Sequence, residues 1–448
     1  MQSLKIFNTY TNSLEEFIPH HLNHVSIYVC GPTVYNYIHI GNARPVVFFD
    51  VVRRYFESKG YFVKFVSNFT DVDDNIIEKA QAENVSELEI SNRYIKAFLN
   101  DVESLGSKTD YIKPKVTEYM DEIISYINDL ILTGFAYEVE GDVYFRVSKI
   151  SEYGKLSNRK LDDLISGARI EINPLKENPL DFNLWKKTSK GINWDSPFSQ
   201  GRPGWHTECV AMIEDLFGEE IDIHGGGSDL IFPHHENEIA HSFAKHNHNV
   251  AKYWMHNGRL NLETEKMSKS LGNVIFVKDL TVNKMAFRLF ILSTHYRAPL
   301  NFNYDNLLSV EKEWIKLENT VKSLFRKIEL HSDDKPLTNV SSEEINKFLQ
   351  DFDEAMELDF NTPNAITALQ ALIKYCNILL REKANITLLK SALSACQFML
   401  NILGLSVELT LLCEEDKQLL SRWKEARKMK DFALADKLRE ELTLRNLI

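Results

Sequence analysis

The sequence lacks the features of a secreted or membrane-spanning chain. No apolar run approaches the ~18 residues that a membrane span requires, and the first seven residues hold no apolar segment of the kind that signal peptides carry. Cysteine is scarce, with five residues in 448. An odd number of cysteines scattered through a long chain argues against a disulfide framework. We therefore expect a cytoplasmic protein with reduced thiols and no membrane partner.

The chain also lacks an excess of positive charge. Its formal net charge is −12 and its pI is near 5.7, which taken alone argues against nucleic acid as the main partner, because a phosphate backbone binds clustered lysine and arginine. Net charge is an average, however, and residues 422–445 contain eight Lys and Arg against five Asp and Glu. This segment is a candidate for a local basic face.

The length and hydrophobic pattern predict several domains. At ~100–200 residues per domain, 448 residues make two to four. Residues 24–68 read as a strand, a helix ended by Gly60 and a second strand, which together form a βαβ unit. From residue 280 onward the apolar spacing is helical almost without a break, which predicts a bundle of four or five helices.

Other elements follow from periodicity and turn residues. Thr70 reads as the N-cap of a helix through residues 76–80. Residues 225–229, Gly-Gly-Gly-Ser-Asp, read as a loop at the carboxyl end of a strand, where ligands of open α/β sheets bind. The remaining predictions are helices over residues 91–105, 116–132, 205–217 and 234–243, a hairpin over 135–147, strands over 221–224 and 253–256, and a mobile polar loop over 265–272.

The stretch from Tyr28 to Arg44 carries the first candidate site. It reads as a short strand, a Gly-Pro turn and a helix that begins near Gly41. A helix start offers free backbone N–H groups and a positive dipole end, and glycine lets a ligand approach the backbone, so phosphate would bind well there. His39 and Asn42 flank this turn and can donate hydrogen bonds to charge that develops on a phosphate.

These residues resemble a known family. His39-Ile-Gly-Asn42 is similar to the His-Ile-Gly-His motif of class I aminoacyl-tRNA synthetases, and Lys266-Met-Ser-Lys-Ser270 matches their second motif in all five letters. Asn42 departs from the first motif, in which the fourth residue is a second histidine. An amide can still donate a hydrogen bond, but it cannot be cationic. Within that family the chain resembles the cysteinyl-tRNA synthetases in four segments, at residues 28–31, 204–209, 224–229 and 233–240.

The resemblance spans nearly the whole chain, weakens after about Leu405, and implies a fold. The fold is α/β, a Rossmann-like parallel-sheet catalytic domain interrupted by a connective insertion and followed by an α-helical bundle that binds tRNA. We expect family members to continue further at the C-terminus, into a small segment associated with the anticodon. The implied parts are residues 1–105 and 202–260 for the catalytic halves, 106–201 for the insertion, 261–305 for the motif loop and linking fold, and 306–448 for the helical domain.

The resemblance also implies an activity. A monomer would activate L-cysteine with ATP and Mg²⁺ to cysteinyl-adenylate and then transfer the acyl group to tRNA(Cys). No protein nucleophile is needed, so catalysis would consist of positioning and charge stabilisation. The implied residues are His39, Gly41, Asn42, Lys266 and Lys269 at the triphosphate, Gly226 and Asp229 at the adenosine, and Thr33 and Trp205 at the substrate pocket, with His39, Asn42, Lys266 and Lys269 catalytic.

A metal site is the remaining candidate. Cys209, His234 and Glu238 offer sulfur, nitrogen and oxygen, His234 and Glu238 share a helix face, and Cys30 would be a fourth ligand. This mixture suits zinc, although the spacing alone does not specify it, because no Cys-x-x-Cys is present. The resemblance implies that these four residues hold one Zn²⁺ per chain and select the substrate thiolate. Four protein ligands already complete a tetrahedral zinc, so we expect Glu238, the hardest and weakest of them, to loosen when the substrate binds.

Two alternatives stay open, and a third is excluded. A cysteine ligase with a small amine acceptor would keep the chemistry, but the long helical region after about residue 300 favours tRNA. A nucleotide- or tRNA-binding module without catalysis would not need His39, Lys266 and Lys269. A metallopeptidase helix of the form His-Glu-x-x-His is excluded, because Ile239 occupies the position of its second histidine.

Overall fold

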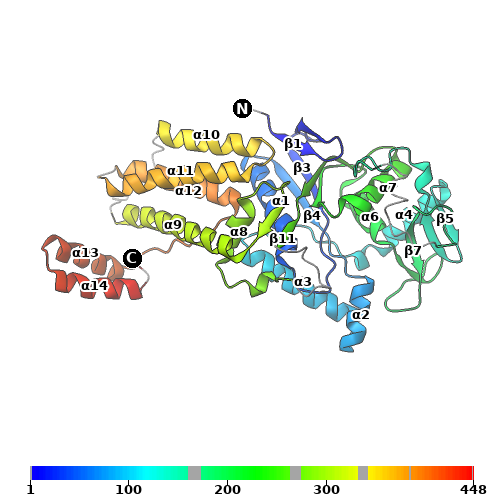
Figure 1. Ribbon diagram of the computed structural model, residues 1–448, viewed down its shortest axis with the longest axis horizontal. Helices are drawn as coiled ribbons and strands as arrows, with labels where there is room; N and C mark the ends of the chain where they lie inside the picture. Colours follow the sequence, from blue (N-terminus) through cyan, green and yellow to red (C-terminus); the bar gives the residue numbers. More distant parts are fainter. Residues whose placement is uncertain are drawn as a thin grey trace. The chain divides into compact units, whose positions relative to one another are not determined.

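Figure 1 shows the computed structural model, which describes residues 3–159, 173–262, 274–330, 342–382, 385–445 and 447. The chain divides into two compact units. Unit 1 comprises Met1–Lys312, Phe352–Ile366 and Asn401–Leu405, and unit 2 comprises Glu313–Asp351, Thr367–Leu400 and Ser406–Ile448. The loop expected at residues 265–272, with Lys266 and Lys269, lies outside the described residues.

The centre of unit 1 is a parallel sheet with the strand order β10-β9-β3-β4. The expected βαβ unit is confirmed, since β3 (His24–Val29) pairs in parallel with β4 (Phe62–Ser67) and α1 (Ile40–Ser58) connects them. On its other side β3 pairs with β9 (Ile221–Gly227), which pairs with β10 (Ala251–Asn257). The order therefore reverses between β3 and β9, and open α/β sheets bind ligands beyond the carboxyl ends of such strands.

Helix α1 is fixed by buried polar contacts as well as by apolar packing. The Arg44 guanidinium donates to the carbonyls of Gly258 (2.6 Å) and His295 (3.0 Å). Six residues further along α1, the buried carboxylate of Asp50 accepts hydrogen bonds from Arg54 and Arg288. Burial favours the neutral form of Asp50, but these two cations outweigh it and hold the pKa of this carboxyl below its usual value.

The rest of unit 1 surrounds this sheet. Its other elements are β1 (Lys5–Asn8), β2 (Ser13–Glu16), α2 (Asp74–Glu83), α3 (Glu87–Ser104), α6 (Trp205–Phe217), α7 (Glu236–His246), β11 (Leu260–Leu262), α8 (Lys284–Leu292) and β12 (Leu300–Phe302). The prediction that Thr70 caps the helix after it is wrong. Asp73 is the N-cap of α2, since its side chain accepts from the Asn75 N–H and a carboxylate at that position also suits the helix dipole.

The segment expected to be an insertion forms its own antiparallel sheet. The predicted hairpin is confirmed as β5 (Ala136–Val139) and β6 (Asp142–Phe145), and β7 (Phe182–Lys187) and β8 (Gly201–Pro203) extend that sheet. The helix predicted over residues 116–132 begins later, as α4 (Met120–Leu132), because residues 116–118 form a 3-10 turn. Buried side chains of α4, α6 and α7 then share one core with this sheet.

Unit 2 contains the predicted helical bundle. Its helices are α9 (Tyr304–Glu329), α10 (Glu343–Glu357), α11 (Thr362–Arg381), α12 (Ile386–Leu403), α13 (Glu414–Lys428) and α14 (Phe432–Leu444), the first four of which begin or end in unit 1. In unit 2, Asn377 on α11 donates to Thr320 on α9, and the thiols of Cys376 and Cys396 on α11 and α12 lie 3.7 Å apart. Residues 405–413 are not helical, so helix formation after residue 280 is less continuous than predicted.

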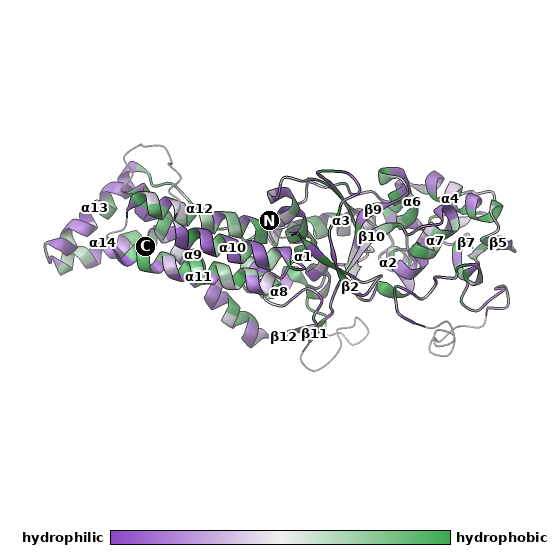
Figure 2. Cartoon of the chain, turned by 90° about the horizontal axis from the view of Figure 1, so that it is seen from above, coloured by the Kyte–Doolittle hydropathy of each residue, from purple (hydrophilic) through white to green (hydrophobic). Residues whose placement is uncertain are grey.

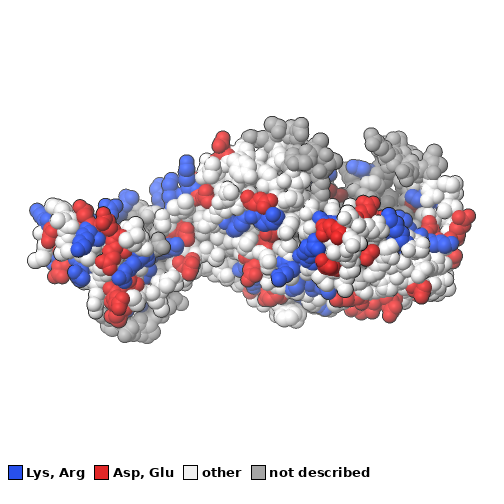
Figure 3. Space-filling model, turned by 90° about the horizontal axis from the view of Figure 1, so that it is seen from below, with Lys and Arg blue, Asp and Glu red and all other residues white. Residues whose placement is uncertain are grey.

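Helices α13 and α14 form a hairpin with a small core of their own, which includes Leu420, Leu438 and Leu442. Helix α13 is largely hydrophilic (Figure 2). Lysines and arginines alternate with acidic residues on the face of the hairpin that Figure 3 shows, and Arg445 pairs with Asp416 and Glu441. That face is therefore mixed in charge rather than uniformly basic.

Helix α12 qualifies the expectation about apolar runs. Its 18 residues, Ile386–Leu403, have a mean hydropathy of 1.4, enough by length and composition to cross a membrane. Half of this window is buried inside the protein. A core helix of a bundle passes the same test, so the finding is weak evidence for a span.

We predict that Arg288→Met lowers the free energy of unfolding by about 3 kcal/mol, because it removes one partner of the buried Asp50 carboxylate. Urea denaturation followed by tryptophan fluorescence measures the change. Arg93→Met is the matched control, since Arg93 makes its ion pairs with Glu83 and Glu89 on the surface and should contribute little. Equal losses in the two variants would contradict the role of Arg288.

Candidate functional site

The four residues proposed as metal ligands lie together. The Cys30 thiol is 3.7 Å from the Cys209 thiol and 3.6 Å from Oε1 of Glu238. Nε2 of His234 is 3.7 Å from the Cys209 thiol and 2.9 Å from the same carboxylate oxygen. One ligand atom from each of the four residues lies within 4.8 Å of all the others.

The fold explains how distant residues meet. Cys30 follows the last residue of β3, Cys209 lies on α6, His234 lies in the turn Ile231–His235, and Glu238 lies in the first turn of α7. After Cys30 the chain passes close to the end of β4. A Cβ atom at Gly31 would lie 1.6 Å from the Asn68 carbonyl oxygen, so only glycine allows this approach.

The donor set fits a tetrahedral zinc ion. With Zn–S of ~2.3 Å and Zn–N or Zn–O of ~2.0–2.2 Å, tetrahedral ligand atoms are separated by ~3.3–3.8 Å. The separations that involve sulfur, 3.6–3.7 Å, already have these values. The separation of 2.9 Å between His234 and Glu238 is that of a hydrogen bond, so a metal ion would replace the proton that these two side chains share.

The pKa values of the four side chains in this cluster are shifted in different directions. Burial and the neighbouring Cys209 raise the pKa of the Cys30 thiol well above its usual value. The hydrogen bond from Cys30 lowers the pKa of Cys209 to about 6 despite its burial. Burial also opposes the charged forms of His234 and Glu238. The attraction of Glu238 and Cys209 nevertheless raises the pKa of His234 to about 10, and His224 and His234 hold the pKa of Glu238 well below its usual range.

A second layer of histidines surrounds the cluster, and the sequence reasoning missed it. His224 on β9 places Nε2 2.6 Å from Oε2 of Glu238, and Nδ1 of His206 lies 3.0 Å from Nδ1 of His234. His235 places Nε2 3.3 Å from the Cys30 thiol and Nδ1 2.8 Å from His256. The residues Cys30, His224, His235 and Glu238 thus form an alternative ligand set.

Two of these histidines could have been identified as site residues from the sequence. The predicted strands at residues 221–224 and 253–256 end in His224 and His256. In the sheet, Trp254 pairs with His224 and His256 pairs with Gly226, so the two histidines lie on adjacent strands, His256 near the end of β10 and His224 in the middle of β9, which is longer than predicted. Neighbouring predicted strands with terminal histidines indicate a site at the carboxyl edge of the sheet.

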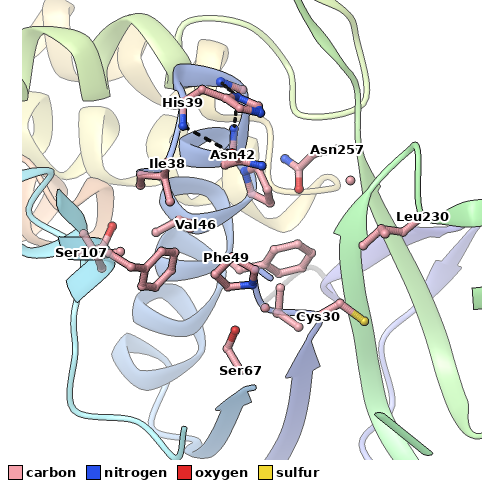
Figure 4. Close-up of a pocket in the computed structure, with 18 of the residues that line it drawn as sticks. Cys30, Ile38, His39, Asn42, Val46, Phe49, Ser67, Ser107, Leu230 and Asn257 are labelled. Atoms are coloured by element: carbon pink, nitrogen blue, oxygen red, sulfur yellow. Dashed lines mark hydrogen bonds between the residues drawn. The ribbon is translucent and has the colours of Figure 1, made fainter. Parts of the chain in front are cut away.

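A pocket of about 510 Å³ lies beside the cluster. Figure 4 shows His39 and Asn42 at one end of it, Cys30 at the other, and Phe49 between them. Among the predicted site residues, its wall includes Cys30, Thr33, His39, Gly41, Asn42, Trp205 and Asp229. Gly226 does not line it, although the neighbouring Gly227 does.

The start of α1 differs from the expectation. His39 is the N-cap residue, and its Nδ1 accepts hydrogen bonds from the backbone N–H groups of Gly41 (3.1 Å) and Asn42 (3.2 Å). In return, the side-chain oxygen of Asn42 accepts from the His39 N–H at 3.3 Å. Two of the N–H groups expected to be free for phosphate are therefore occupied by His39.

The three consecutive glycines are strand residues, not the predicted loop, because β9 continues to Gly227. A Cβ atom at Gly225 would lie 2.2 Å from the ring of Phe49 on α1. A Cβ atom at Gly226 would meet the ends of the Leu230 and His235 side chains at 2.9–3.0 Å. Gly225 thus lets α1 pack closely on the sheet, a role that the sequence reasoning did not consider.

Two further side chains point to ligand binding. The Trp205 indole, 43% exposed, stacks on His234 with ring centroids 4.2 Å apart, so it covers a candidate metal ligand at the pocket wall. Asn257 also lines the pocket, and its buried amide oxygen and nitrogen have no hydrogen-bond partner among the described residues. An unsatisfied buried amide suits a polar ligand, because leaving both groups unpaired is costly.

Comparisons with known domain families and with individual proteins agree on the family of this chain. Residues 16–312 match the tRNA synthetases class I (C) catalytic domain, and residues 351–408 match the DALR domain. The chain is 48% identical to the cysteine–tRNA ligase of Bacillus cereus (strain G9842) and 47% identical to that of Anoxybacillus flavithermus (strain DSM 21510 / WK1). Each alignment covers 100% of this chain and 97% of the relative, so the expected shortfall at the C-terminus is not seen against these proteins.

Solved structures support the fold. A methionyl-tRNA synthetase of Mycobacterium tuberculosis, bound to methionyl-adenylate, superposes with a TM-score of 0.64. The match covers 92% of this chain and 96% of the other at 12% identity, so it shows the fold alone. The predicted α/β catalytic fold with a helical domain is thereby confirmed.

We predict that Gly225→Ala destabilises the protein by about 1–3 kcal/mol, because the new methyl group collides with the Phe49 ring. Gly226→Ala is the matched control in the next position of the same strand, where the methyl group meets the end of the Leu230 side chain at 2.9 Å and the His235 ring at 3.0 Å, a milder contact than the 2.2 Å at Gly225. Thermal unfolding measures both. Adding Phe49→Leu should recover part of the loss in Gly225→Ala, and the collision is refuted if the double variant is no more stable.

Proposed function

Because this chain belongs to the cysteine–tRNA ligases of the class I aminoacyl-tRNA synthetase family, we propose that it selects cysteine through a zinc ion held by Cys30, Cys209, His234 and Glu238. Enzymes of this kind activate an amino acid with ATP and attach it to tRNA. The convergence of two thiols, an imidazole and a carboxylate carries the proposal, and one of the four residues, Cys30, lines the pocket.

Between the two possible ligand sets, the one with two thiols is favoured. Cys209 already favours its thiolate form, and thiolate is the ligand form of cysteine. His234 points Nε2 at the cluster while Nδ1 contacts His206, the arrangement in which an outer partner orients a metal-ligating imidazole. His224 and His235 then act as positioning residues for Glu238 and Cys30.

The need for a metal follows from the substrate. A pocket that reads shape alone separates side chains of nearly equal size by only ~10- to 200-fold. When bound, zinc supplies a bond that the cysteine thiolate forms and a serine hydroxyl forms poorly. The chain's own residues contribute by covering His234 with the Trp205 ring and by keeping Glu238 wholly buried.

The opposite end of the pocket suits the nucleotide. His39, Gly41 and Asn42 form the start of α1, whose dipole favours phosphate. Asp229 and the unpaired Asn257 amide line the same pocket and are assigned to the adenosine or the amino acid, and Thr33 to the substrate pocket. Lys266 and Lys269 are assigned to the triphosphate on the motif alone, and Mg²⁺ would accompany ATP.

The helical part is assigned to tRNA(Cys). The DALR match at residues 351–408 covers the whole of α11 and α12 and the end of α10. A small amine acceptor would leave these helices without a role, so the cysteine ligase alternative is not favoured. We expect a monomer in the cytoplasm, where all five cysteines remain the free thiols that the structure contains.

We predict that zinc removal abolishes the preference for cysteine. Amino-acid-dependent pyrophosphate exchange with cysteine and with serine, before and after chelation, measures this preference. Cys209→Ser should lower the bound zinc from one equivalent to a small fraction, because it removes a thiolate ligand. Cys413→Ser is the control, since Cys413 is exposed and outside the cluster. Unchanged discrimination in protein shown to be free of zinc would reject the proposal.

We predict that Lys269→Ala lowers the rate of pyrophosphate exchange by about 10²–10³-fold, the loss expected when one donor to a charged transition state is removed. Lys278→Ala, a surface lysine that pairs with Asp279, is the control and should exchange at the wild-type rate. Wild-type exchange in Lys269→Ala would exclude this lysine from catalysis.

A further inference from the structure

A second group of ligand-type side chains lies at the carboxyl ends of α6 and α7. Glu219 follows the end of α6 by two residues, His246 is the last residue of α7, and His248 lies in the turn before β10. Oε1 of Glu219 is 3.8 Å from Nδ1 of His246, and its Oε2 is 3.4 Å from Nε2 of His248. One ligand atom from each of the three lies within 4.8 Å of the others.

The local backbone brings the two histidines together. Asn247 takes the left-handed conformation (φ 61°) and ends α7, which turns the chain within one residue. The rings of His246 and His248 consequently stack with their centroids 5.6 Å apart. Helices α6 and α7 pack against each other, which brings Glu219 to the same place (Figure 1).

The outward ring nitrogen of each histidine already has a partner. Nε2 of His246 lies 3.1 Å from a carboxylate oxygen of Glu214, and Nδ1 of His248 lies 2.9 Å from the carbonyl oxygen of Asn249. A carbonyl or carboxylate oxygen only accepts, so these nitrogens carry the ring hydrogens of the neutral imidazoles. Nε2 of His248 also lies 3.4 Å from Glu219, but this contact is longer than the 2.9 Å between Nδ1 and Asn249, which favours the hydrogen on Nδ1. With these tautomers, the lone pairs of Nδ1 of His246 and Nε2 of His248 face Glu219. Metal-ligating imidazoles are oriented by outer hydrogen bonds of this kind.

Two ring lone pairs that face a carboxylate repel it electrostatically, and a cation bound between them would remove this repulsion. Two helices end here, and the carboxyl end of each contributes partial negative charge. The nearby cation Lys245 is engaged elsewhere, since its Nζ bonds Glu214 (2.8 Å) and Asp129 (2.9 Å). It thereby fixes Glu214, the partner of His246.

We propose that Glu219, His246 and His248 form a second divalent-metal site, separate from the thiolate cluster. Two imidazoles and a carboxylate, without sulfur, suit Zn²⁺ and neighbouring transition-metal ions better than Mg²⁺ or Ca²⁺. Water completes the coordination, because Glu219 and His248 are partly exposed. The bound ion links the ends of α6 and α7, the two helices that also carry Cys209 and Glu238.

Zinc binding by the full-length protein tests the site. After the first equivalent is loaded, the protein is dialysed against buffered Zn²⁺ at free concentrations that bracket a dissociation constant on the order of 1–10 µM, weaker than for closed four-ligand sites. Wild type should take up a second equivalent. His248→Gln and Glu219→Gln should stop at one, and Glu214→Gln should bind the second ion about 10- to 100-fold more weakly.

His24→Gln is the matched control, because it removes an exposed imidazole elsewhere on unit 1. It should retain both equivalents. Co²⁺ distinguishes the two sites, since thiolate ligands give an intense near-ultraviolet charge-transfer band and imidazole and carboxylate ligands do not. Circular dichroism and cysteine-dependent pyrophosphate exchange of His248→Gln should match wild type, because these residues do not line the pocket.

The proposal fails if wild type takes up a single equivalent in this range. It also fails if His248→Gln and Glu219→Gln retain the second ion, or if His24→Gln loses it, since the extra metal would then be adventitious. A second Co²⁺ equivalent that strengthens the charge-transfer band would place the ion at thiols and likewise overturn it.

Discussion

The wholly buried carboxylate of Glu238 constrains the centre of this enzyme. Moving an ionised carboxylate out of water costs several kcal/mol, which cations and donors around it must offset. The side chains that do so come from three places, His224 on β9, His234 in the turn before α7, and Cys30 after β3. The strand order β9-β3 and the position of α7 over these strands are therefore requirements of the site as well as of the core.

The connection between β6 and β7 of the inserted segment supports the same helix from outside. The Glu236 carboxylate at the start of α7 accepts backbone hydrogen bonds from Gly154 (2.9 Å) and Ser157 (2.8 Å). The Tyr153 hydroxyl donates to the side chain of Asn237 at 2.6 Å. These contacts immobilise the turn of helix between His234 and Glu238. The segment that interrupts the catalytic fold thus holds the start of α7, which supplies Glu238 and follows directly on the turn that supplies His234.

Sequence reasoning found the βαβ unit, most helices and the separation of sheet from bundle, because apolar periodicity reports burial directly. It paired His234 with Glu238 because helical spacing places them on one face. It could not pair Cys30 with Cys209, which are 179 residues apart, without the family resemblance. It also took the three glycines after His224 for a ligand loop, since a single sequence does not show that Phe49 occupies the space beside Gly225.

The capping of α1 by His39 has a consequence for how the pocket fills. The first N–H groups of a helix need acceptors, and the His39 ring supplies one for two of them. A triphosphate that bonds the same N–H groups would have to displace the imidazole, which would free that ring to contact the phosphates. Binding of any anion at the start of α1 would therefore be coupled to a rotation of the His39 side chain.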